Sequence, residues 1–129
     1  MNRERETAPP ALHELEALVM EEVWRQGETT VREVRNALNC GEKQRAYTTV
    51  MTIMARLDRK GVLTRERVGK ADIYRPVLSR QKYLEARAEA EVQALVAEFG
   101  DIALAHFAEQ VEKLDSKRLE ALRKLAARD

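Results

Sequence analysis

Four residues that recur at helical spacing have the chemistry to read the edges of DNA base pairs. They are Thr48, Thr52, Ala55 and Arg59, which fall on one side of a helix at about 100° per residue. Threonine hydroxyls bond base edges or phosphates, and the methyl groups of threonine and alanine fit the thymine methyl. Arginine reaches a phosphate or a guanine. The spacing and residue types therefore indicate a DNA-reading helix face.

The opposite side of the same segment is apolar. Val50, Ile53, Met54 and Leu57 lie within one arc and are expected to pack on a core. Gly61 follows where a helix needs a left-handed C-cap. The pattern predicts an amphipathic helix that ends before this glycine. The alternative without a ligand is an ordinary solvated helix face.

A basic β-hairpin is expected directly after this helix. Residues 62–76 predict two short strands joined by a Gly69-Lys70 turn, and Arg65, Arg67 and Lys70 are its candidates for phosphate or minor-groove contacts. Residues 43–75 hold nine Lys or Arg and three Asp or Glu, a net charge of +6, whereas the 129-residue chain carries only +1. One localised basic surface suits a specific DNA binder.

The helix and the hairpin together supply the expected DNA contacts. Tyr47 has two readings, a phosphate contact or a support for the start of the helix. The expected set is Tyr47, Thr48, Thr49, Met51, Thr52, Ala55, Arg56, Arg59, Arg65, Arg67 and Lys70.

Two earlier helices are expected to position this face. We expect residues 1–10 to form a flexible lead and a first helix to follow over about residues 12–25. Thr30 and Glu33 have the spacing of a capping box, which opens a short second helix that ends before residues 39–41. Trp24 is expected to plug the core between the first helix and the sheet. These elements predict a winged helix-turn-helix domain over residues 11–78.

The remaining residues, 79–129, predict a module of three amphipathic helices. Ser79 could cap a helix that runs to Phe99, Asp101 the next helix over residues 102–113, and Asp115 or Ser116 the last one. Fewer than about 60 residues bury little apolar surface, so we expect this module to form a homodimer. The alternative is that the module packs back onto its own winged helix. The expected dimer contacts are Leu84, Val92, Leu95, Phe99, Leu104, Phe107, Val111, Leu114, Leu119, Leu122 and Leu125.

The fold class expected is therefore mainly α with a small β-hairpin, and several functions are disfavoured. No apolar run approaches the roughly 18 residues of a membrane span, so we expect no membrane insertion. The single cysteine, Cys40, excludes an internal disulfide and fits the cytoplasm. Cys40, His13 and His106 lack metal-site spacing, so no metal is expected. Without a phosphate loop, nucleophile motif or paired carboxylates, neither an enzyme nor a cofactor is expected.

The whole chain resembles the penicillinase-repressor family, the BlaI and MecI group with its copper-responsive CopY relatives. Four segments carry the resemblance: LHELEALVMEEVW (residues 12–24), TVREVRNAL (30–38), YTTVMTIMARLDRKG (47–61) and ADIYRP (71–76). The resemblance implies a homodimeric repressor that binds an inverted-repeat operator on double-stranded DNA. It also implies release after a β-lactam or cell-wall signal, through a membrane sensor-protease or its downstream protease.

Family members are cut before a phenylalanine in the C-terminal module. The matching segment is IALAHFAEQV (102–111), so the resemblance places the cut between His106 and Phe107. His106 departs from the asparagine of the best-known members. His13 and Ala46 likewise stand where relatives often have helix-capping residues.

A function from a different class is a winged helix that binds only another protein. Such a protein adaptor would use the basic face against acidic partner helices. An adaptor surface more often exposes aromatic or leucine side chains. The threonine-rich face flanked by arginine therefore favours DNA.

Overall fold

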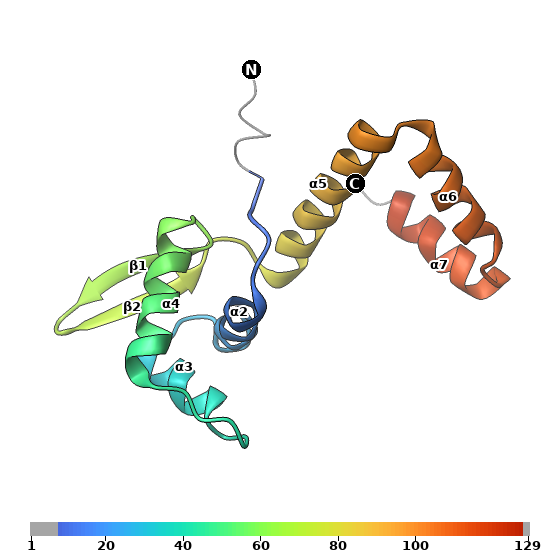
Figure 1. Ribbon diagram of the computed structural model, residues 1–129. Helices are drawn as coiled ribbons and strands as arrows, with labels where there is room; N and C mark the ends of the chain where they lie inside the picture. The colour runs from blue at the N-terminus through green and yellow to red at the C-terminus, as the bar shows by residue number, and fades with distance from the viewer. Residues whose placement is uncertain (1–7, 128–129) are drawn as a thin grey trace. The chain divides into compact units, whose positions relative to one another are not determined.

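The computed structural model describes residues 8–127, which form six helices and one antiparallel hairpin (Figure 1). The predicted fold class, mainly α with a small hairpin, is confirmed. The chain divides into two compact units, one up to Ala88 and one from Glu89. In order, the elements are α2 (Glu14–Gln26), α3 (Val31–Leu38), α4 (Tyr47–Arg59), β1 (Leu63–Val68), β2 (Ala71–Pro76), α5 (Arg80–Phe99), α6 (Asp101–Glu112) and α7 (Ser116–Ala127).

Local hydrogen bonds begin the first two helices. Helix α2 starts two residues later than predicted, after His13, whose backbone N–H donates to Glu16 Oε1 at 2.9 Å. The predicted capping box of α3 is confirmed. The Glu33 N–H donates to Thr30 Oγ1 at 3.2 Å, and the Thr30 N–H donates to Glu33 Oε1 at 3.0 Å.

The end of α4 is a glycine-dependent turn. Gly61 has a φ of +83°, as its predicted place beyond the helix requires. The Gly61 N–H donates to the Asp58 carbonyl at 3.1 Å, and the Val62 N–H donates to the Leu57 carbonyl at 2.9 Å. This pair of bonds is a Schellman motif, which satisfies the last carbonyls of α4 and turns the chain into β1.

The core of the first unit lies between α2, α3, α4 and the hairpin. The apolar face predicted for α4 is buried throughout, at Val50, Ile53, Met54 and Leu57. Burying such side chains stabilises a fold by roughly 1.5–3 kcal/mol each. The burial of this face therefore fixes the direction in which the opposite face of α4 points.

The hairpin is joined by the predicted Gly69-Lys70 turn. Its register pairs Val68 with Ala71 and Leu63 with Pro76. Gly69 has a φ of +63°, and no non-glycine residue among residues 8–127 has a positive φ, which fits a type II′ turn.

One bridge that the sequence did not predict ties β2 to the segment before α3. The Thr29 N–H donates to the Tyr74 carbonyl at 3.0 Å, and the Tyr74 N–H donates to the Thr29 carbonyl at 2.8 Å. A single bridging residue has no periodic pattern, so sequence gives no signal for it. The bridge anchors the hairpin to the helices, and the Tyr74 side chain is buried in the core.

Trp24 packs against the core, as predicted, but it is only partly buried. Its indole N–H donates to the Leu78 carbonyl at 3.0 Å. Its ring lies 5.3 Å from the Tyr83 ring on α5. The indole N–H needs an acceptor, and the chain between β2 and α5 supplies one where a sheet interior would not.

The start of α5 belongs with the first unit. The Tyr83 hydroxyl donates to the Pro10 carbonyl, and Arg87 Nη1 donates to the Pro9 carbonyl at 3.1 Å. These bonds hold the last residues of the predicted N-terminal lead. The rest of that prediction, for residues 1–7, lies outside the described residues.

The second unit holds the remainder of α5 with α6 and α7. Gly100, with a φ of +62°, is the N-cap of α6 in place of the predicted Asp101, which lies in the first turn. Asp115 caps α7, because its Oδ1 accepts from the Arg118 N–H at 2.8 Å. Among the described residues of this unit, Ala103 is the only buried one.

We predict that Gly61→Ala lowers the free energy of unfolding by about 1 kcal/mol or more, because the left-handed backbone crowds a Cβ atom. Gly41→Ala is the matched control, since Gly41 has no positive φ and no atoms within 4 Å of a Cβ placed there. Urea unfolding of both variants measures the difference. Equal destabilisation by both substitutions would contradict the role of the positive φ.

Candidate nucleic-acid interface

The face of α4 opposite the core is open to solvent. Thr48, Thr49, Thr52 and Arg59 are exposed along it, and Figure 1 shows the helix beside the hairpin. Ala55, the fourth residue of the predicted face, is half-buried, and so is the flanking Arg56. The flanking Tyr47 and Met51 are each 42 % exposed. The structure thus presents the predicted groove-facing residues on one continuous helix surface.

The turn that leads into α4 is held by a side chain that sequence reasoning missed. Asn39 Oδ1 accepts from the Arg45 N–H at 2.8 Å, and Asn39 Nδ2 donates to the Arg45 carbonyl at 3.0 Å. Gln44 Nε2 also donates to the Asn39 carbonyl at 2.9 Å. These bonds fix the turn between α3 and α4, where Ala46 provides no side-chain cap. An asparagine after a helix was the available signal, because its amide can imitate backbone groups.

The nine basic residues between positions 43 and 75 fall into two groups. Five of them lie within 4.0 Å of a carboxylate: Arg56, Lys60, Arg65, Arg67 and Arg75. Within residues 8–127, no carboxylate pairs with the other four: Lys43, Arg45, Arg59 and Lys70. The unpaired cations are the best available phosphate contacts, and two of them, Lys43 and Arg45, were not among the predicted site residues.

Arg65 on the hairpin contacts both β2 and α4. Its Nη1 donates to the Tyr74 hydroxyl at 3.2 Å, and its guanidinium lies 5.9 Å from the centre of the Tyr74 ring. Its Nη2 lies 3.7 Å from Asp58 Oδ2 on α4. Arg65 therefore ties the hairpin to the end of α4.

A buried carboxylate lies on the other side of the same helix end. Glu16 on α2 is 1 % exposed, and its Oε2 accepts from Lys60 Nζ at 2.8 Å. Arg56 Nη1 is 4.0 Å from the same oxygen. Burial alone would raise the pKa of the Glu16 carboxyl, but the Lys60 hydrogen bond, the His13 N–H and the nearby positive charge together hold this pKa below its ordinary value.

The residues considered for metal binding are not gathered into a site. Within the described part of the chain, no three His, Cys, Asp or Glu side chains form a group that could hold a metal ion. Cys40 is exposed in the turn after α3. Across the same residues, no helix has both the length and the apolar character needed to cross a bilayer.

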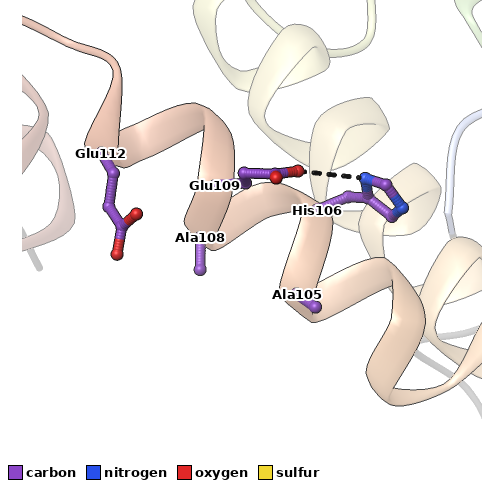
Figure 2. Close-up of a pocket in the computed structure, with 5 residues that line it drawn as sticks. All are labelled: Ala105, His106, Ala108, Glu109 and Glu112. Carbon is purple, nitrogen blue, oxygen red and sulfur yellow. Dashed lines mark ion pairs between the residues drawn. The ribbon is translucent and has the colours of Figure 1, made fainter.

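His106 and Phe107, the predicted cleavage position, lie in the middle of α6. Figure 2 shows the His106 ring and the Glu109 carboxylate directed toward each other, with Nδ1 and Oε1 3.6 Å apart. Both side chains are exposed, and with Ala105, Ala108 and Glu112 they line an open hollow on the helix. The bond between His106 and Phe107 is therefore part of a regular helix.

Comparison with known proteins identifies the group to which this architecture belongs. A model of the penicillinase repressor family matches residues 12–128. The chain belongs to this family. It is 36 % identical over 118 residues to the transcriptional regulator BlaI of Mycobacterium tuberculosis, in strains CDC 1551 and H37Rv, which covers 90 % of this chain and 83 % of that protein.

Two solved structures resemble part of the chain. One is a solution structure of the DNA-binding domain of the repressor BlaI, 26 % identical with a TM-score of 0.50, which covers 57 % of this chain and 89 % of that one. The other is the monomeric form of Bacillus licheniformis BlaI in complex with the blaP half-operator, also 26 % identical, with a TM-score of 0.48 and the same coverage.

The protein is therefore a transcriptional repressor of the BlaI type with a winged-helix DNA-binding domain. The predicted family is confirmed, and so is the expectation that the chain is not an enzyme, because its relatives are transcriptional regulators.

We predict that Lys70→Ala lowers the salt dependence of DNA binding by about 0.9 in log K against log salt, the contribution of one phosphate contact. Arg65→Ala is the matched hairpin variant, and its salt slope stays close to that of the unsubstituted protein, because Tyr74 and Asp58 hold that guanidinium. Titrations of one duplex at several salt concentrations give both slopes. A larger loss of slope for Arg65→Ala than for Lys70→Ala would show that Arg65, rather than Lys70, contacts phosphate.

Proposed function

We propose that this repressor binds an inverted-repeat operator as a homodimer, with α4 in the major groove and the hairpin beside it on the backbone. The observation that supports this most directly is the exposed face of Thr48, Thr52 and Arg59 on α4. Among residues 8–127, the nearby Lys43, Arg45 and Lys70 have no carboxylate partner. Threonines provide base contacts, and the unpaired cations provide phosphate contacts. The half-operator named for the Bacillus licheniformis relative is the same class of ligand.

The homodimer is inferred from the second unit, which leaves its apolar side chains in water. Among the residues predicted for the interface, three are half-buried: Leu114, Leu119 and Leu122. The others are between 38 % and 56 % exposed: Val92, Leu95, Phe99, Leu104, Phe107, Val111 and Leu125 of the second unit, and Leu84, which lies in the first. A second copy would remove this surface from water, and two-fold symmetry would match an inverted repeat.

Release of the operator is proposed to follow a cut between His106 and Phe107 after a cell-wall or β-lactam signal. A membrane sensor-protease, or a protease downstream of it, is the proposed partner, and the repressor acts beside the chromosome in the cytoplasm. Proteases need extended backbone, so α6 must open locally before cleavage. Few buried contacts hold this helix, which lowers the free energy of such opening.

The operator proposal is tested by titrating the full-length protein against duplexes from the promoter of its own gene, with random duplex as the control. We expect a preference of roughly three orders of magnitude or more and a steep salt dependence. Thr48→Ala should lose discrimination at one base position of each half-site while it keeps the salt slope. Equal binding of promoter and random DNA would contradict operator recognition and favour the protein adaptor.

The dimer is tested by Val111→Asp, which places a charge on an exposed apolar position of α6. We expect a monomer in analytical ultracentrifugation with weaker operator binding, because a buried unpaired charge strongly disfavours association. Gln110→Asp is the matched control, since it adds the same charge at the neighbouring exposed position. A dimer that survives Val111→Asp would place the interface elsewhere.

A further inference from the structure

The buried carboxylate of Glu16 on α2 forms ion pairs with side chains at the end of α4. Both of its cationic partners, Arg56 and Lys60, come from the C-terminal end of α4, one helical turn apart. Lys60 keeps 29 % and Arg56 keeps 43 % of the side chain exposed, so both are at the surface of the DNA-binding unit. Arg59, between them in sequence, has no carboxylate partner among the described residues.

Helix capping does not account for a charge at this position. The bond from the His13 N–H to Glu16 Oε1 needs only an acceptor, and glutamine serves that purpose in capping boxes as well as glutamate does. Stability is also a weak reason, because a buried ion pair loses in desolvation much of what it gains in attraction. The negative charge therefore has its clearest effect on Lys60, its hydrogen-bonded partner, and a weaker effect on Arg56 at 4.0 Å.

We propose that Glu16 is a specificity-determining residue: its charge holds Lys60 and Arg56 against α2 and so keeps them from making sequence-independent phosphate contacts. The proposal rests on the operator recognition proposed above, and it assigns a role to a buried residue of α2. Specificity is a difference between two affinities, so it rises when binding to the wrong DNA is suppressed.

The released cations would act more strongly on random DNA than on the operator. Base contacts hold the protein in one register on the operator, so Lys60 and Arg56 reach only the phosphates that this register offers. On random DNA no base contact fixes the register, and the protein settles where its cations neutralise the most phosphates. Loss of the Glu16 charge should therefore reduce the ratio of operator affinity to random-DNA affinity.

The first experiment measures random-duplex binding by full-length Glu16→Gln, which keeps the capping acceptor and removes the charge. Glu14→Gln is the matched control, because it changes the net charge equally from an exposed position in the same helical turn. One new phosphate contact steepens the salt slope by about 0.9 and tightens binding roughly eightfold near 0.1 M salt. We expect this change for Glu16→Gln and a much smaller one for Glu14→Gln. Equal effects of the two substitutions would overturn the proposal.

The same titrations on the promoter duplex test the effect on specificity. The ratio of promoter to random affinity should fall severalfold for Glu16→Gln and stay constant for Glu14→Gln. An equal rise on both duplexes would show that Glu16 does not determine specificity. Absence of promoter preference in the unsubstituted protein would sink the operator proposal instead, while the random-duplex comparison would still decide whether Glu16 restrains the two cations.

A second pair of variants does not depend on how well Glu16→Gln folds. Lys60→Gln and Arg59→Gln each remove one positive charge from adjacent residues at the end of α4, and glutamine can still donate to Glu16 at position 60. Because Lys60 is held by Glu16, Lys60→Gln should leave the salt slope unchanged, whereas Arg59→Gln should lower it by about 0.9. An equal loss of slope in both variants would show that Lys60 already contacts phosphate and would refute the restraint.

Discussion

The burial of one apolar face of α4 is the constraint from which the interface follows. Val50, Ile53, Met54 and Leu57 pack among α2, α3 and the hairpin, and a helix whose one side is held cannot rotate. The opposite side, with Thr48, is therefore held in water at a fixed angle to the hairpin. The Schellman turn at Gly61 adds the second restraint, because it sets the direction in which the chain leaves for β1.

The number of cations free to bind DNA around α4 depends on which basic side chains are paired with carboxylates. It cannot be read from the net charge. Glu16, Asp58, Glu66 and Asp72 each lie within 4.0 Å of a cation, and these ion pairs differ in strength. The Arg67–Asp72 pair is exposed, so it contributes little and is easily exchanged for a phosphate. Lys60 and Glu16 are joined at 2.8 Å with the carboxylate buried, so the exchange is costly there. Fewer cations are therefore free to contact phosphate than the net charge of residues 43–75 suggests, and their positions are known.

The two units differ in how they satisfy their apolar side chains. The first unit encloses a core with Tyr74, Met20 and Met54 fully buried. The second unit has the same kind of amphipathic helices, yet Phe99 is 50 % and Ile102 is 65 % exposed. In the proposed dimer, folding and association of this unit are coupled, so its stability depends on protein concentration. A cut in α6 would then weaken operator binding through loss of the second subunit.

The elements and their faces can be predicted from the amino acids alone, because helical period, capping residues and turn glycines are local signals. The helix at 47–59, the Thr30–Glu33 capping box and the Gly69-Lys70 turn were all predictable on that basis. Only the tertiary structure decided the contacts between residues far apart in the chain. The Thr29–Tyr74 bridge, the place of Trp24 and the pairing of Glu16 with Lys60 join segments whose approach no local pattern encodes. Whether a charged or hydrogen-bonding group has a partner depends on the residues that packing places beside it, and these residues come from distant parts of the chain.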